Sequence, residues 1–399
     1  MAKACPTPQP FRAVVGTVTV VTLRFFFTFV ARFIFSPLFP TISKELGFKS
    51  GQAGTLFLLG AVGMLVGSAI AGFVSSRLNH RGTMLLSVLG MSAVLIGAHF
   101  AHSLGALRAI FIVLGILAGM QLPSSVATIT GTVRQQDWET ALSVQQTGPP
   151  LSLVASPLIA AGLLLAFGWN TALLWVAGLG IVLAVIFFLG FGGIGAFPGE
   201  IPSPAHIKPV VSTRSFWVMI WLFALGMGAQ VGIFTMLPLY LTQEQGMTSA
   251  HANTILGLAN ISPVAVVFLS GWVSTKIGER AAMSLFLSLT GVLVVLVGLL
   301  SGPALVVCIF LMAGLAVGFF APAFTSLSRI VQPDHRSLAA GFATPIAFLL
   351  GGGLLPMALG YLGQASSFGL GISIAGAVIA VGSSATLLLR LLTDLEAGC

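Results

Sequence analysis

Long apolar runs, separated by short polar or Gly/Pro-containing stretches, follow one another along almost the whole chain. Most runs are about as long as the roughly 20 residues that an α-helix needs to cross the hydrocarbon core of a bilayer. Runs of this length with few charges predict membrane-spanning helices. Twelve spans are predicted, near residues 13–42, 51–75, 82–101, 105–133, 139–167, 171–192, 214–242, 250–275, 281–300, 303–329, 336–363 and 368–391.

The composition excludes a water-soluble protein. Only 7% of the 399 residues are charged and 57% are hydrophobic, whereas a soluble domain carries about 25% charged residues. A soluble chain of this composition would expose larger apolar patches than monomeric proteins tolerate. We therefore expect an all-α, multi-pass membrane protein in which the spans leave no room for a separate catalytic domain.

The basic residues predict how the chain is oriented in the membrane. If the N-terminus lies inside, the inner segments hold most of the 17 basic residues, while the outer loops hold only Lys44 and Lys49. Cytoplasmic loops are enriched in Lys and Arg. Both termini are thus expected in the cytoplasm, with the protein in the plasma membrane, the inner membrane of a bacterium. The sequence has no tight cluster of basic residues, so we expect no nucleic-acid partner. We expect the protein to be a monomer.

The sequence repeats itself at an offset of 199 residues, half its length. The matched pairs include Glu45 with Glu244, Gly72 with Gly271, Arg77 with Lys276, Arg81 with Arg280, and Pro157 with Pro356. An ungapped register over more than a hundred residues indicates a duplication with both halves in the same orientation. The repeat predicts two pseudo-symmetric six-helix bundles, 1–191 and 214–399, joined by a cytoplasmic linker at 192–213 that contains several prolines.

Residues 72–81 and 271–280 resemble the signature loop of the major facilitator superfamily, which joins the second and third helices of each half. The acidic residue of that signature is replaced by Ser76 in one copy and by Thr275 in the other. The resemblance implies the twelve-helix fold of that family and transport by rocker-switch alternating access. Basic side chains at a membrane edge can bond helix C-terminal carbonyls in one state and release them in another. We therefore assign conformational switching to Gly72, Arg77, Arg81, Gly271, Lys276 and Arg280, with a solvated surface charge as the alternative for the basic residues.

Ionisable side chains inside the spans are candidates for function because they are costly in hydrocarbon. All acidic residues and all histidines fall in loops, in tails or at span ends, which leaves Arg24 and Arg32 in the first span. Arg108 lies near an outer end and can extend to the interface. Arg24 and Arg32 are about 12 Å apart along a helix. They predict contacts to a substrate anion, with a structural role on backbone carbonyls as the alternative.

The spacing from Arg32 to Pro40 is similar to that in the first helix of organic-anion and organophosphate members of the superfamily. Those members commonly carry a second basic residue on the seventh helix. At the positions 199 residues beyond Arg24 and Arg32 this chain has Phe223 and Val231 instead. A monovalent anion is therefore expected rather than a phosphate dianion.

Neutral polar residues in the spans complete the candidate site. Interhelical hydrogen bonding is the alternative for any one of them, but together they lie on helices that line the central cavity in this family. The candidates for substrate binding are Gln121, Gln145, Gln146, Gln230 and Asn260. Prolines break the helical hydrogen-bond ladder where the rocking halves must bend, and those candidates are Pro149, Pro157, Pro345 and Pro356.

The sequence contains no phosphate-cradling loop, metal-ligand cluster or nucleophile-base pair, so we expect neither enzyme activity nor a cofactor or metal. We expect a secondary active or facilitative transporter of a small solute, biased toward a small organic anion. No acidic residue or histidine lies mid-span to carry a coupled proton. We therefore expect uniport, exchange, or symport in which the substrate carries its own proton. Two alternatives stay open: efflux of amphipathic or hydrophobic compounds, and a transport-inactive membrane receptor or assembly factor.

Overall fold

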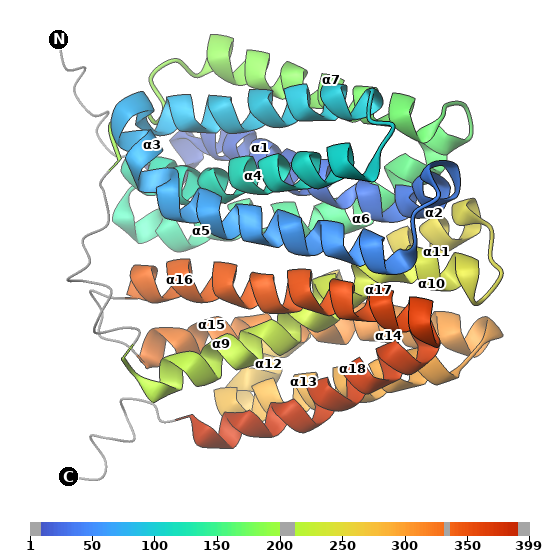
Figure 1. Ribbon diagram of the computed structural model, residues 1–399. Coiled ribbons are helices and arrows are strands. Elements are labelled where there is room, and N and C mark those ends of the chain that lie inside the picture. The colour runs from blue at the N-terminus through green and yellow to red at the C-terminus, as the bar shows by residue number, and fades with distance from the viewer. Residues whose placement is uncertain (1–8, 200–211, 331–335, 390–399) are drawn as a thin grey trace. The chain divides into compact units, whose positions relative to one another are not determined.

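The computed structural model describes residues 9–199, 212–330 and 336–389, and these are helical almost throughout (Figure 1). Ten helical stretches in the described part are long and apolar enough to cross a membrane. One of them, the 50-residue α3 (Ser50–His99), contains two spans. The shorter α11 (Ser249–Ala259) and α12 (Pro263–Ile277) together cover the eighth expected span. The all-α architecture of twelve spans is confirmed.

The remaining helices alternate long segments with short breaks. The first half contains η1 (Phe11–Ala13), α1 (Val15–Phe33), α2 (Phe35–Leu46), α4 (Leu104–Thr132), η2 (Gln135–Asp137), α5 (Trp138–Gln145), α6 (Gly148–Leu164) and α7 (Trp169–Gly190). The second half contains α9 (Arg214–Met227), η3 (Gly228–Ile233), α10 (Phe234–Gln243), α13 (Glu279–Leu299), α14 (Gly302–Gly318), α15 (Phe320–Arg329), α16 (Arg336–Phe348), η5 (Leu349–Leu354), α17 (Leu355–Ala365), α18 (Phe368–Gly382) and η6 (Ser383–Leu388). Of the elements labelled η, η3 and η5 are π-helical and the others are 3-10 turns.

The backbone repeats at the same offset as the sequence. Asn79 breaks α3 with a φ of 58°, and Gly278, 199 residues later, separates α12 from α13 with a φ of 83°. Positive φ values are accessible to Gly and, less easily, to Asn. Gly72 and Gly271 lie inside helices, as the predicted spans 51–75 and 250–275 have them, and the residues with positive φ make the turn.

Two compact units make up the chain. Of the described residues, one unit contains those within 1–42 and 62–202, and the other contains those within 43–61 and 203–399. Within the second unit, the start of α3 packs closely on α17, and the Ser50 hydroxyl donates a hydrogen bond to the Gly360 carbonyl at 3.0 Å. The boundaries at 191 and 214 stay predictions, and residues 200–211 of the expected linker lie outside the described part.

An apolar layer joins α1, α4 and α5 inside the first unit, where these helices are neighbours in Figure 1. The layer consists of the buried residues Val14, Val18, Val21, Ile129, Val133 and Ala141. On another face, α4 approaches α3 so closely that a Cβ added at Gly119 would lie 2.7 Å from the Ser68 amide nitrogen. Small residues permit such approaches between membrane helices. The two contacts fix which face of α4 meets each neighbour.

Breaks and π-helical segments interrupt several spans near prolines. The fifth span breaks at Gln146, and Pro149 then lies in the first turn of α6. Pro157 and Pro345 lie inside α6 and α16, whereas Pro356 lies in the first turn of α17, directly after η5. π-Helical turns occur often at functional sites. Whether the four prolines bend during transport stays a prediction.

Candidate functional site

Among the described residues of the first unit, Arg24 is the charged residue with the least exposed surface. It is 0% exposed, and none of its three guanidinium nitrogens has a hydrogen-bond partner in the described part of the chain. Its guanidinium carbon lies 4.0 Å from the centroid of the Phe187 ring on α7. A ring face attracts a cation, but it does not accept the hydrogen bonds of the guanidinium N–H groups. The Phe187 ring therefore offsets part of the positive charge of Arg24, but the guanidinium N–H groups have no acceptor among the described residues.

Neutral polar side chains of α4 and α5 are also buried without full hydrogen bonding. The Gln145 amide nitrogen donates to the Ser125 hydroxyl at 2.5 Å. The other Gln145 amide atom, both amide atoms of Gln121 and the Ser124 hydroxyl are buried without a partner among the described residues. We call Gln121, Ser124, Ser125 and Gln145 the neutral polar cluster. Its unmet donors and acceptors are what a polar ligand can satisfy.

Helix packing places Arg24 and this cluster on the same side of the apolar layer. Arg24 comes three residues after Val21 of the layer, and Gln145 comes four residues after Ala141. Ser125 comes four residues before Ile129, on a helix that runs in the opposite direction through the membrane. One helical turn rises about 5.4 Å. All three helices therefore present polar side chains about one turn beyond the apolar layer.

Arg32 lies farther along α1, close to the middle of the span Val15–Leu46. It is 8% exposed, and one guanidinium nitrogen donates to the Met64 sulfur at 3.1 Å. A thioether is a weak acceptor. Arg32 is thus a second cation of the first unit, at a different depth from Arg24.

The other predicted substrate contacts do not belong to the neutral polar cluster. Gln146 is exposed directly after the end of α5, whereas Gln145 is buried. Gln230 lies in the π-helical η3 and Asn260 at the end of α11, both in the second unit. The buried Asn260 side chain donates to the Leu256 carbonyl of its own helix at 2.8 Å. Phe187 is the residue that the sequence analysis missed, because a Phe within an apolar span gives no signal of its own.

Each copy of the signature loop shows the same local contacts. The Ser76 hydroxyl bonds the Phe73 carbonyl at 2.8 Å, and the equivalent Thr275 hydroxyl bonds the Trp272 carbonyl at 2.7 Å. The basic residue that follows lies over the same aromatic side chain in each half. Arg77 lies 4.4 Å from the Phe73 ring centroid, and Lys276 lies 5.9 Å from the Trp272 ring. The basic residues thus stack on a ring four positions earlier.

Arg81 connects the loop to the end of α7. Its guanidinium donates to the Phe188 carbonyl at 2.9 Å, in the last turn of that helix. A cation is favourable at a helix C-terminus, where carbonyl groups lack intrahelical partners. In the second unit an ion pair, Arg329 with Glu279 at 3.1 Å, links the end of α15 to the start of α13. These contacts are of the kind expected for the switching residues, whose role in switching stays a prediction.

The first residues of the expected linker are docked on this loop. The amides of His80 and Arg81 donate to the carbonyls of Phe197 and Gly195, at 3.1 and 2.8 Å. The Phe197 ring packs edge-on against the His80 ring, with centroids 4.9 Å apart. The first amides of a helix need partners from outside it. Residues 195–197 therefore complete the start of the helix that follows Asn79.

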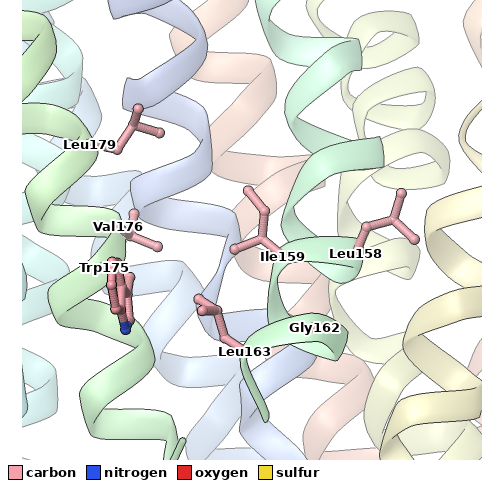
Figure 2. A pocket seen from close by; sticks show the side chains of 7 residues that line it. All are labelled: Leu158, Ile159, Gly162, Leu163, Trp175, Val176 and Leu179. Carbon is pink, nitrogen blue, oxygen red and sulfur yellow. The ribbon is translucent and has the colours of Figure 1, made fainter. Parts of the chain in front are cut away.

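A separate cavity of about 340 Å³ lies between α6 and α7 (Figure 2). Its lining is Leu158, Ile159, Gly162, Leu163, Trp175, Val176 and Leu179. The Trp175 side chain is 58% exposed, so the cavity opens on the surface of the bundle. This lining is suited to a lipid acyl chain rather than to a charged solute. In the described part of the chain, no group of three or more His, Cys, Asp or Glu residues could hold a metal ion.

The repeated halves, the twelve spans and the buried polar residues define a multi-pass membrane transporter. The family model of the Major Facilitator Superfamily matches residues 21–356 and 236–396, and the chain belongs to this superfamily. The expected family, fold and general function are confirmed. The family and the curated relatives are transporters rather than enzymes.

Relatives at low identity cover most of the chain. A D-galactonate transporter of Escherichia coli is 21% identical over 87% of this chain and 89% of its own length. A gallate transporter of Pseudomonas putida is 24% identical over 80% of this chain and 81% of its own. A solved bacterial homologue of the human lysosomal transporter Spinster, in an inward-facing and occupied conformation, shares the fold. Its TM-score is 0.79 at 17% identity, covering 97% of this chain and 98% of the other.

Proposed function

We propose that this protein transports a small organic anion by alternating access and that Arg24 holds the anionic group. The observation that carries the proposal is the burial of the Arg24 guanidinium without a hydrogen-bond partner in the described residues. A buried cation without compensation costs several kcal/mol. A substrate carboxylate can remove that cost, since it accepts two N–H groups of a guanidinium side by side. The names of the galactonate and gallate transporters support an organic acid as substrate.

Arg24 is closed off in this conformation, so the anion must reach it in another state of the cycle. The Phe187 ring then compensates part of the guanidinium charge while the site is empty, and the N–H groups stay available for the substrate. Arg32, bonded to the Met64 sulfur, offers a second cation along α1. Arg32 thus provides a second binding position for an anion that moves through the first unit.

A guanidinium stays protonated at physiological pH and cannot relay a proton. No acid or histidine lies within the transport path that we propose, so the transport mode is anion uniport, exchange, or symport of a substrate that carries its own proton. The protein works as a monomer in the inner membrane of a bacterium, with both termini in the cytoplasm. The excess of basic residues in alternate loops supports this orientation.

Uptake into proteoliposomes tests the proposal, with labelled gallate, D-galactonate and benzoate as probes. Arg24→Gln removes a charge-assisted interaction of about 1.5–3 kcal/mol, so kcat/KM for the transported anion should fall by about 10- to 150-fold. Arg108→Gln is the matched control, because Arg108 is an exposed arginine of the same unit. Its uptake should equal that of the unmodified chain.

Three outcomes would contradict the proposal. Normal anion uptake by Arg24→Gln would remove Arg24 from the site. Normal movement of a neutral hydrophobic compound by the Arg24→Gln, Arg32→Gln double variant, together with no anion uptake by the unmodified chain, would favour efflux. No flux of any solute, with ligand binding retained, would favour a membrane receptor.

A further inference from the structure

The neutral polar cluster has more hydrogen-bonding capacity than the described protein groups use. The Gln121 amide has two N–H donors and one carbonyl acceptor without partners, and the Ser124 hydroxyl is also unpartnered. The Gln145 amide oxygen is a further free acceptor. All three residues are at most 1% exposed. Buried polar groups without partners are uncommon in native proteins, and each requires an explanation.

The cluster lies on a different side of α4 from the close contact with the first span of α3. Gly119, which meets α3, lies about 200° around the helix from Gln121 at 100° per residue. Gln121 and Ser125 are four residues apart and lie on one face, and Ser125 accepts the hydrogen bond of Gln145 from α5. The side of α4 that carries the cluster therefore lies away from the Ser68 turn of α3 and toward α5, while Met84, in the second span of α3, contacts the Thr128 hydroxyl on this same side. The unpartnered groups collect at this one place.

The chemistry of the cluster selects the group that fits it. A carboxylate can accept from the Gln121 amide and the Ser124 hydroxyl, but it has no donor for the free carbonyl oxygens of Gln121 and Gln145. An alkyl group would leave all the polar atoms unpaired, which costs free energy at each of them. A hydroxyl group donates one hydrogen bond and accepts two. It can therefore donate a hydrogen bond to a glutamine oxygen and accept a hydrogen bond from the Gln121 amide or the Ser124 hydroxyl.

We infer that the neutral polar cluster binds a hydroxyl group of the substrate, so that the transported anion is a hydroxylated carboxylate. This inference rests on the proposed function, in which Arg24 holds the carboxylate. Arg24 and the cluster lie on the same side of the apolar layer, on helices that pack on one another. One small molecule can thus place its two ends on the two groups. A buried water molecule in the cluster is the competing explanation.

Matched pairs of anions test the inference, since a site that hydrogen-bonds a substrate hydroxyl rejects the analogue that lacks it. The pairs are 4-hydroxybenzoate with benzoate, lactate with propionate, and gluconate with hexanoate. In proteoliposomes the unmodified chain should prefer the hydroxylated member of at least one pair by about tenfold or more in kcat/KM. Gln121→Met and Gln145→Met should each reduce this preference by about fivefold or more, because a thioether chain of similar size makes no comparable hydrogen bonds.

The control variant is Ser92→Ala, which removes a buried hydroxyl of the same unit that bonds its own helix at Val88. It should leave the preference unchanged. A purely structural role of the glutamines would lower uptake of both members of a pair equally, and that result overturns the inference. Thermal unfolding of each purified variant identifies a loss of folding, and Gln121→Asn then gives a milder change at the same place.

The outcomes separate this inference from the proposed function. If Arg24→Gln abolishes anion uptake but the unmodified chain takes up both members of every pair equally, the cluster holds only water and the inference is wrong. If the hydroxyl preference is present and falls in the glutamine variants while Arg24→Gln has no effect, the inference stands and the role of Arg24 is wrong. Uptake of no hydroxylated probe overturns both.

Discussion

Replacing Gly54 by alanine tests a close helix contact of the second unit. Gly54 lies in the early turns of α3, and an added Cβ would lie 2.7 Å from the Met357 Cα and still closer to the Pro356 carbonyl oxygen. Carbon atoms in contact are about 3.5–4.0 Å apart. The helices α3 and α17 would therefore have to separate by about 1 Å.

The magnitude follows from the contacts that this movement disturbs. The hydrogen bond from Ser50 to the Gly360 carbonyl would lengthen from 3.0 Å to about 4 Å and be lost, at about 0.5–1.5 kcal/mol. Overpacking adds about 1–3 kcal/mol. Alanine is better than glycine in a helix by about 1 kcal/mol. The net loss should be about 0.5–3.5 kcal/mol.

The assay compares Gly54→Ala with Gly97→Ala, since Gly97 lies in the same α3 and its added Cβ would meet nothing within 4 Å. Thermal unfolding of the purified protein in detergent should show a lower midpoint for Gly54→Ala. The midpoint of Gly97→Ala should be unchanged or slightly higher. Equal midpoints for the two variants, with equal uptake rates, would refute the packing argument.

Two further predictions concern a helix end and the loop. The Glu244 carboxylate accepts from the Phe368 and Gly369 amides at 2.6 and 2.8 Å, so Glu244→Gln should cost about 1–2 kcal/mol at the start of α18. Faster hydrogen exchange at the Phe368 and Gly369 amides would show this loss. Unchanged exchange would mean that Glu244 does not stabilise the start of α18. Arg81→Gln removes the bond to Phe188, so we expect a lower maximal uptake rate with little change in KM. A raised KM at a normal maximal rate would instead place Arg81 in the binding site.

Local chemistry explains why the sequence predicted the architecture well. A span must be long and apolar because lipid offers no partners for backbone or charged groups. The duplication is equally visible, and the backbone turns at Asn79 and Gly278 keep its offset of 199 residues. The cost of a charge in hydrocarbon likewise identified Arg24 as a candidate from the sequence. These features depend on residue type and spacing alone.

Tertiary structure decided which side chains meet. The predicted spans 51–75 and 82–101 left a gap where α3 continues as a helix to Asn79, because the position of the turn depends on which residue accepts a positive φ. Nothing in the pattern distinguishes Phe187, which stacks on Arg24, from other phenylalanines of the spans. Gln145 and Gln146 are adjacent in sequence, yet only the packing of α5 on α4 buries one and exposes the other. Contacts between residues far apart in the chain depend on the rotation of each helix, which local sequence does not determine.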